Sequence, residues 1–268
     1  MSFLIQPPWG LSPPRLAPSA FEEEFLMSEE NVREGFDSIK PSACHKQEIA
    51  NLIFMTENEY DYLEQALPGF GRARLIVKAA GDSTRPLGFK GSKFDFYRFA
   101  NRFRLATAFQ GMNLEGFTEE TTTGYSSLTR VFFTWSAFEG YTELADDQAP
   151  PYRTLFANYP RHHIRDLAKL CREQDPQNLL GSFLEEHAQS APQVIFLKKF
   201  REGNDLAVLT HAACIRHIFA HGRLTAHPNG LTAENMTTIC DALSEFISDF
   251  IRSDFDRRLK LASSLNPS

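Results

Sequence analysis

Apolar residues in the second half of this chain recur at spacings of three and four, which is the repeat of an α-helix. Residues 126–145 and 232–251 carry this pattern over several turns. Shorter stretches follow it at residues 164–171, 179–187, 194–200 and 206–221. Helices of this kind bury their apolar stripes by packing against one another. We therefore predict a mainly all-α protein with a helical bundle over residues 124–265.

The first half of the chain divides into a tail and a region of unknown role. Residues 1–20 contain repeated prolines, and we expect them to form a flexible, extended tail. Residues 112–124 are rich in Gly, Thr and Glu, which makes this segment the best domain or subdomain boundary. Residues 21–123 therefore form the N-terminal region, which we predict to be helical with room for short strands.

Several local signals support helices within that region. Residues 43–67 lack Gly and Pro and carry apolar residues at helical spacing, until the Pro68–Gly69 pair ends the pattern. Ser92 followed by Asp95 resembles a capping box, which indicates that a helix begins there. Residues 72–80 are short and fit either a strand or a helix.

Composition limits where the protein works and what it binds. The net charge is −6 over 268 residues, so any contact with nucleic acid has to be local. No apolar run approaches the roughly 20 residues that a membrane span needs, and the N-terminus lacks the pattern of a secretory signal. The four cysteines include no CxxC pair, which favours a reducing compartment. We expect a cytoplasmic protein without a membrane partner.

The segment HAACIRHIFAHGR, residues 211–223, concentrates the candidate chemistry of the chain. On a helix His217 and His221 lie four positions apart and share a face, with Arg216 beside them. Gly222 predicts that the helix ends at His221, where the helix dipole favours a protonated imidazole. A guanidinium is a forked cation that suits a phosphate, and an imidazole can exchange a proton with a ribose hydroxyl. These residues therefore predict phosphodiester chemistry.

Two other interpretations of the same segment stay open from the residues alone. The segment can be an ordinary helix end whose basic residues are solvated. Cys214, His217 and His221 at positions i, i+3 and i+7 also have the spacing of three zinc ligands, with His211 or His227 as a fourth.

Further cationic and aromatic residues are candidates for nucleic-acid contact. Lys198, Lys199 and Arg201 form a locally basic stretch, and we predict that they contact the RNA backbone together with Arg223. An ordinary solvated face is the alternative. A second basic cluster at residues 161–165 receives no role. We expect core packing rather than base stacking for a set of aromatic residues: Phe94, Phe96, Phe99, Phe103 and Trp135.

The phrase RHIFAHG, residues 216–222, resembles the RX4-6H signature of HEPN domains. These are small helical bundles, many of which are metal-independent endoribonucleases. The residue after the arginine is typically polar in this family, and His217 fits that position. WSAFEGYTEL, residues 135–144, is similar to the first long helix of HEPN domains, and the closing helix after HPNG is similar as well. The resemblance covers about residues 124–261.

The resemblance implies a homodimer in which the two motif helices meet, so that the active site contains Arg216 and His221 of both chains. Arg216 would bind and polarise the scissile phosphate of RNA. His221 would act as general base or acid while a 2′-hydroxyl attacks and leaves a cyclic phosphate. His217 would orient these groups, and Glu139 matches an acidic position of some HEPN groups that positions the arginine. No metal or cofactor is expected.

The resemblance also implies a stress or defence effector, with an inhibitor or regulatory protein as a further partner. One departure concerns the HEPN toxins paired with nucleotidyltransferase antitoxins, which usually carry a Tyr two residues after the His. This chain has Arg223 there, so we do not assign it to that toxin group. The alternative from another class is a non-catalytic HEPN-like dimeric scaffold that binds a protein or a nucleotide through the same groove.

Overall fold

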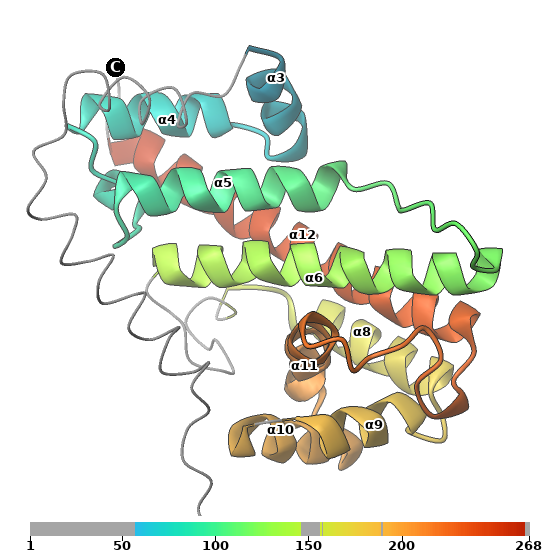
Figure 1. The fold of residues 1–268 in the computed structure, drawn as a ribbon. Coiled ribbons are helices and arrows are strands. Elements are labelled where there is room, and N and C mark those ends of the chain that lie inside the picture. The colour runs from blue at the N-terminus through green and yellow to red at the C-terminus, as the bar shows by residue number, and fades with distance from the viewer. Residues whose placement is uncertain (1–56, 146–155, 157, 189, 266–268) are drawn as a thin grey trace, which may run out of the picture. The chain divides into compact units, whose positions relative to one another are not determined.

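The computed structural model describes residues 57–145, 156, 158–188 and 190–265. The chain divides into residues 1–54 and 55–268, and every described residue belongs to the second unit. Within these described ranges the regular structure is helical and no strand occurs (Figure 1). The prediction of a mainly all-α fold is therefore confirmed. The predicted tail, residues 43–56 of the first predicted helix and the predicted break after Ala145 lie outside the described residues.

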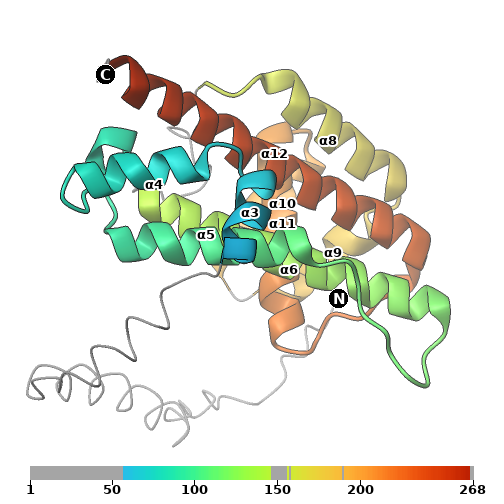
Figure 2. The same cartoon turned by 90° about the horizontal axis from the view of Figure 1, so that it is seen from above.

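Three long helices form the centre of the bundle: α5 (Lys93–Ala108), α6 (Glu119–Ala145) and α12 (Ala233–Leu265). α6 packs against both α5 and α12 (Figures 1 and 2). This position explains why α6 is buried on several sides. Small residues of α6 lie where another segment of the chain comes close to its backbone, and large residues fill the core. A Cβ on Gly124 would lie 2.7 Å from Ala226 Cβ, whereas Val131, Phe138 and Leu144 are fully buried.

A second group of shorter helices lies on the other side of α6 from α5 (Figure 1). They are α8 (Arg161–Gln174), α9 (Leu179–His187), α10 (Ala191–Arg201) and α11 (Leu209–Ala220), with 3₁₀ turns η2 (Asp205–Val208) and η3 (Pro228–Gly230). α11 packs on α6, and α8 packs on α12. α11 is therefore held by the central helix, with its C-terminal end carrying the predicted site.

The segment before α5 folds as two short helices, α3 (Glu57–Ala66) and α4 (Phe70–Ala79), and the 3₁₀ turn η1 (Arg85–Leu87). The ambiguous stretch 72–80 is thus helical apart from its last residue, because Phe70, Ala73 and Val77 form a buried stripe at helical spacing. The chain turns between α3 and α4 at Gly69, which has a φ of +86°. Only glycine adopts this conformation without steric cost, so the predicted end of the first helix is confirmed.

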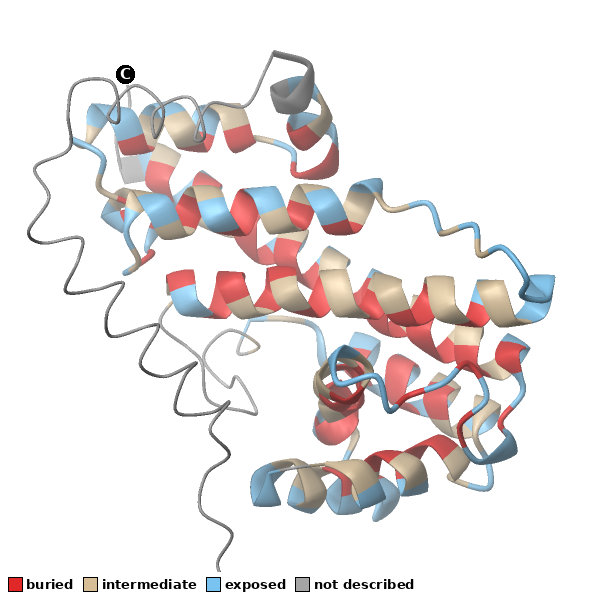
Figure 3. Ribbon diagram, in the orientation of Figure 1, coloured by how far each residue is buried: buried red, intermediate tan, exposed pale blue. Residues whose placement is uncertain are grey.

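The predicted boundary at residues 112–124 does not separate two cores. α6 begins at Glu119, so residue 124 lies inside a helix that continues to Ala145. Buried residues from α5, such as Phe99, pack in the same core as Val131 of α6 and Ile247 of α12. Figure 3 shows this buried layer running through the facing sides of the long helices. Residues on both sides of the boundary therefore contribute to one bundle.

Most aromatic residues considered as base-stacking candidates are in the core. Phe96, Phe99 and Phe103 are fully buried, and the Phe99 ring lies 4.9 Å from that of Tyr141. Trp135 is also buried. Phe94 differs, because 56% of it is exposed. The expectation of core packing is confirmed for four residues and is wrong for Phe94, whose position on α5 faces outward.

The capping box at the start of α5 gives a first test of local stability. Ser92 Oγ accepts a hydrogen bond from Asp95 N at 3.3 Å, and Asp95 Oδ2 accepts one from Ser92 N at 2.8 Å. Replacing Ser92 by alanine is expected to lower the free energy of unfolding by about 1 kcal/mol. Urea denaturation measures this change. Ser264→Ala, at the exposed end of α12, is the control and should change stability by less than about 0.5 kcal/mol.

Candidate active site

The candidate site lies where α11 ends. Ala212, Ile215 and Ile218 are buried, which fixes the face of α11 that packs inward. The helix stops because Gly222 adopts a φ of +66°, and its N–H donates to the carbonyl of Phe219 at 2.9 Å. His221 is therefore the last residue before the turn, and it is exposed. The predicted helix end is confirmed.

Arg216 reaches from α11 to α6 and meets Glu139. Arg216 Nη2 lies 3.3 Å from Glu139 Oε2, and the second carboxylate oxygen accepts a hydrogen bond from Trp135 Nε1 at 3.0 Å. The Arg216 guanidinium also lies 5.9 Å from the centre of the Phe132 ring. About a third of each charged side chain is exposed, so this ion pair contributes little to stability. Its geometric effect is to hold the guanidinium in one place at the surface.

His217 and His221 lie next to each other at the end of α11. Their ring centres are 4.6 Å apart, with the planes at 68°. Burial lowers the pKa of His217, and the nearby His221, Arg216 and Arg223 lower it further. A lowered pKa favours the neutral form of the His217 imidazole at neutral pH. His217 Nε2 and Arg216 Nε have no hydrogen-bond partner among the residues described.

A row of aromatic rings continues from Arg216 along the surface. It consists of Phe132, Phe219, Tyr125 and Phe117, and we call it the aromatic row. Neighbouring ring centres are 6.4, 6.4 and 6.0 Å apart in that order. Phe117 is 55% exposed and the other three are partly exposed. The sequence interpretation missed this row, although its signal is visible: Tyr125, Phe132 and Glu139 recur every seven residues and share a face of α6.

Three of the four residues predicted to contact RNA, Lys198, Lys199 and Arg201, lie on α10 rather than on α11. Lys199 lies 5.1 Å from the Phe196 ring on its own helix, and Arg201 Nη1 pairs with Glu185 of α9 at 3.1 Å. Lys198 is exposed on α10. Arg223 is exposed two residues after His221, and its charge is among those that lower the pKa of His217. Arg223 is therefore an additional cation close to the site for an anionic ligand.

The zinc interpretation is wrong, because Cys214 lies in the core. It is fully buried, and burial raises the pKa of its thiol to about 12. His211 is buried as well, and its Nδ1 lies 3.2 Å from the carbonyl of Val208. Among the side chains that the structure describes, no three His, Cys, Asp or Glu residues are placed to hold a metal ion.

The structure therefore brings together two pairs, Arg216 with Glu139 and His217 with His221, and Arg216 is close enough to His217 to lower its pKa. In the described part of the chain, no helix combines the length and apolar character that crossing a membrane requires. The chain matches no protein-family model, no curated protein and no solved structure.

Proposed function

We propose that this protein is a metal-independent endoribonuclease of the HEPN type, with Arg216 and His221 as its catalytic residues. The observation that carries the proposal is the exposed end of α11. There the Arg216 guanidinium is held 3.3 Å from Glu139, and its charge lowers the pKa of His217, whose ring lies 4.6 Å from that of His221. A fixed forked cation beside a group that exchanges protons is what cleavage of a phosphodiester by its own 2′-hydroxyl requires.

In the proposed reaction Arg216 binds the non-bridging oxygens of the scissile phosphate and stabilises the charge that develops on them. An imidazole removes the proton from the 2′-hydroxyl, whose oxygen forms a bond to phosphorus. The bond from phosphorus to the 5′-oxygen breaks, and that oxygen takes a proton from a second imidazolium. The products are a cyclic phosphate and a free 5′-hydroxyl. Glu139 positions Arg216, and neutral His217 orients the RNA or the His221 ring.

A homodimer supplies the second imidazolium. One exposed His221 per chain can act as base or as acid, but one ring cannot do both in the same step. We propose that two copies place their α11 ends across one cleft, so that each His221 has one of these roles. The partly exposed rings of the aromatic row, which begins at Phe132 near Arg216, suit bases of a single strand that stack on them.

The remaining partners follow from the same proposal. Arg223 contacts a neighbouring phosphate, and Lys198, Lys199 and Arg201 take a more distant part of the RNA backbone. The proposed role is that of a stress or defence effector that cleaves RNA in the cytoplasm and is controlled by an inhibitor.

The test is cleavage of total and transfer RNA by the purified protein in EDTA. We expect fragments that end in cyclic phosphates, at the same rate with and without added Mg²⁺. Cleavage that needs a metal ion would contradict the proposal, as would intact RNA from a protein shown to be folded and dimeric.

The second candidate is a non-catalytic dimeric scaffold that binds a protein or a nucleotide. The specific observation in its favour is the ion pair, because Glu139 neutralises part of the charge that Arg216 would offer to a phosphate. Dimer geometry distinguishes the two candidates. Crosslinking between cysteines introduced at residue 223 of each chain should succeed for the enzyme, whose two α11 ends face each other.

A further inference from the structure

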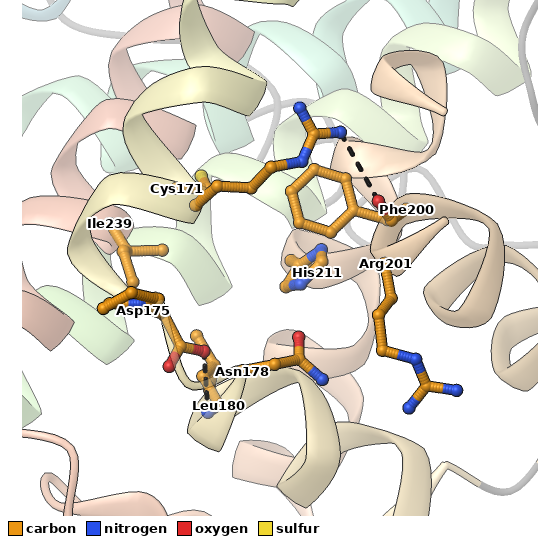
Figure 4. Close-up of a pocket in the computed structure, with 10 residues that line it drawn as sticks. Cys171, Asp175, Asn178, Leu180, Phe200, Arg201, His211 and Ile239 are labelled. Carbon is orange, nitrogen blue, oxygen red and sulfur yellow. Dashed lines mark hydrogen bonds between the residues drawn. The ribbon is translucent and has the colours of Figure 1, made fainter. Parts of the chain in front are cut away.

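A cavity of about 200 Å³ lies apart from the Arg216 site, between the end of α8, the first turn of α9, the end of α10 and α11 (Figure 4). Its walls combine apolar side chains, among them Phe200, Leu180 and Ile239, with several polar ones. Sites for drug-sized ligands have volumes of about 300–1,000 Å³. This cavity therefore suits a compact ligand with apolar faces and a polar edge.

His211 is the most deeply buried polar group of the cavity. Only 3% of it is exposed, and its ring packs edge-on against Phe200 at 4.6 Å. Nδ1 lies 3.2 Å from the carbonyl of Val208, and a carbonyl only accepts, so Nδ1 carries the proton. The distal nitrogen, Nε2, is then a lone-pair acceptor, and in the described ranges it has no hydrogen-bond partner. A ligand that fills the cavity and displaces solvent from this atom has to offer it an N–H or O–H.

The inner end of that ligand has to be neutral. Burial lowers the pKa of His211 to about 4, so the ring carries no charge at neutral pH. The same loss of solvent penalises an ammonium group placed against it. Arg172 and Arg201 also line the cavity, and their positive charges disfavour a second cation there, while the Asp175 carboxylate is engaged by Leu179 N at 2.6 Å and Leu180 N at 2.9 Å. An amide-like N–H or a hydroxyl is therefore favoured over a cation.

Asn178 supplies the complementary group on the opposite wall. Figure 4 shows its amide across from the His211 ring, with the amide oxygen on the His211 side and Nδ2 turned toward the side of Arg201. One hydrogen of Nδ2 points to Ser182 Oγ at 3.3 Å, which leaves the second hydrogen for a ligand carbonyl. Gly181 provides the room for this amide, since a Cβ there would lie 2.1 Å from Asn178 Oδ1. Arg201, half-exposed and paired with Glu185, lines the same cavity.

We propose that this cavity binds a nucleobase with a lactam edge, an N–H beside a carbonyl, as in uracil, hypoxanthine and guanine. The ring N–H donates to His211 Nε2, and the carbonyl accepts from Asn178 Nδ2. The apolar faces of the base pack between Phe200 and the side chains of Leu180 and Ile239. Any sugar and phosphate attached to the base extend toward Arg201. This inference is independent of the proposed nuclease activity.

Calorimetric titration of the whole protein tests the donor requirement. Uracil or hypoxanthine is expected to bind, and uracil methylated on both ring nitrogens should bind at least about tenfold more weakly, because it leaves His211 Nε2 unpaired. Uridine monophosphate distinguishes the source of the base. Tighter binding that Arg201→Ala removes identifies a nucleotide, whereas equal binding identifies the free base, and both results support the base site.

Asn178→Gly tests the site without endangering the fold. Asn178 has a φ of +53° and makes no side-chain cap to α9, so glycine adopts its conformation without cost. This variant is expected to weaken uracil binding by about tenfold. The control is Asp82→Gly, which removes a residue with a φ of +68° that does not line the cavity and should leave binding unchanged. Absence of binding at millimolar base would overturn the proposal, and so would equal affinity of the methylated base or of Asn178→Gly.

Discussion

His221→Ala is expected to slow RNA cleavage in EDTA by about 100- to 10,000-fold, the usual contribution of a general acid or base. The His221 ring is exposed at the end of α11 and packs against the ring of His217. Truncating it removes the group that exchanges protons while leaving the packed face of the helix intact. Melting temperature and dimerisation should therefore match those of the parent. The rate is measured with a fluorescent RNA at saturating substrate.

His227→Ala is the matched control for this variant. His227 is an exposed histidine six residues further on, in the turn before α12, and the proposal gives it no role. Its removal should leave the rate unchanged. If His221→Ala cleaves as fast as the parent, the assignment of the site is wrong. Arg216→Lys adds a sharper test, because an ammonium keeps the charge but loses the fork that binds two phosphate oxygens, and we expect most activity to be lost.

Asp254→Ala is expected to lower the free energy of unfolding by about 3–5 kcal/mol, the usual cost of removing one partner of a buried ion pair. The Asp254 side chain is only 4% exposed. Its Oδ2 accepts from Tyr141 of α6 at 2.7 Å and from Arg258 Nε at 2.6 Å. Arg258 in turn donates to the carbonyl of Gly88 at 2.7 Å. Removing the carboxylate therefore leaves the buried Tyr141 hydroxyl and the largely buried Arg258 guanidinium without the acceptor that Asp254 provides.

Asp249→Ala is the control for this prediction. Asp249 pairs with Arg252 at 3.0 Å on the same helix, but its side chain is 68% exposed. We expect a loss below about 1 kcal/mol there. For a chain of this size, the loss at Asp254 corresponds to a fall in melting temperature of roughly 10 °C. A change at Asp254 no larger than that at Asp249 would show that the network contributes little.

Because Asp254 stabilises the fold as a carboxylate, we expect the free energy of unfolding to depend on pH. Burial by itself raises the pKa of Asp254. The positive charge of Arg258 and the hydrogen bonds from Arg258, Arg257 and Tyr141 outweigh burial, so the pKa is lowered overall. A lowered pKa in the folded state stabilises the protein above the unfolded value of about 3.9. That stabilisation is lost as the pH falls through the folded pKa. The difference between the parent and Asp254→Ala should therefore be full at neutral pH and shrink below about pH 4.

The sequence by itself determined that several segments are helical and where some of them end, because these features depend on neighbours a few residues apart. The spacing of apolar residues predicted α6, α9, α11 and α12, and the capping pair of Ser92 and Asp95 marked the start of α5. Gly222 predicted that α11 ends at His221, because glycine adopts the positive φ of a helix end, and this end leaves His221 exposed. The short segment 72–80 was ambiguous, since a strand and a helix both fit so few residues.

Only the tertiary structure decided which of these residues meet. The spacing placed Cys214 on the side of His217 and His221, yet packing against α6 turned the thiol into the core and left the rings outside. Arg216 and Glu139 are far apart in the chain, as are Tyr141 and Asp254. The cavity around His211 draws its walls from α8, α9, α10, α11 and α12. Contacts of this kind depend on how helices dock and rotate against one another, and that is settled by burying their side chains together.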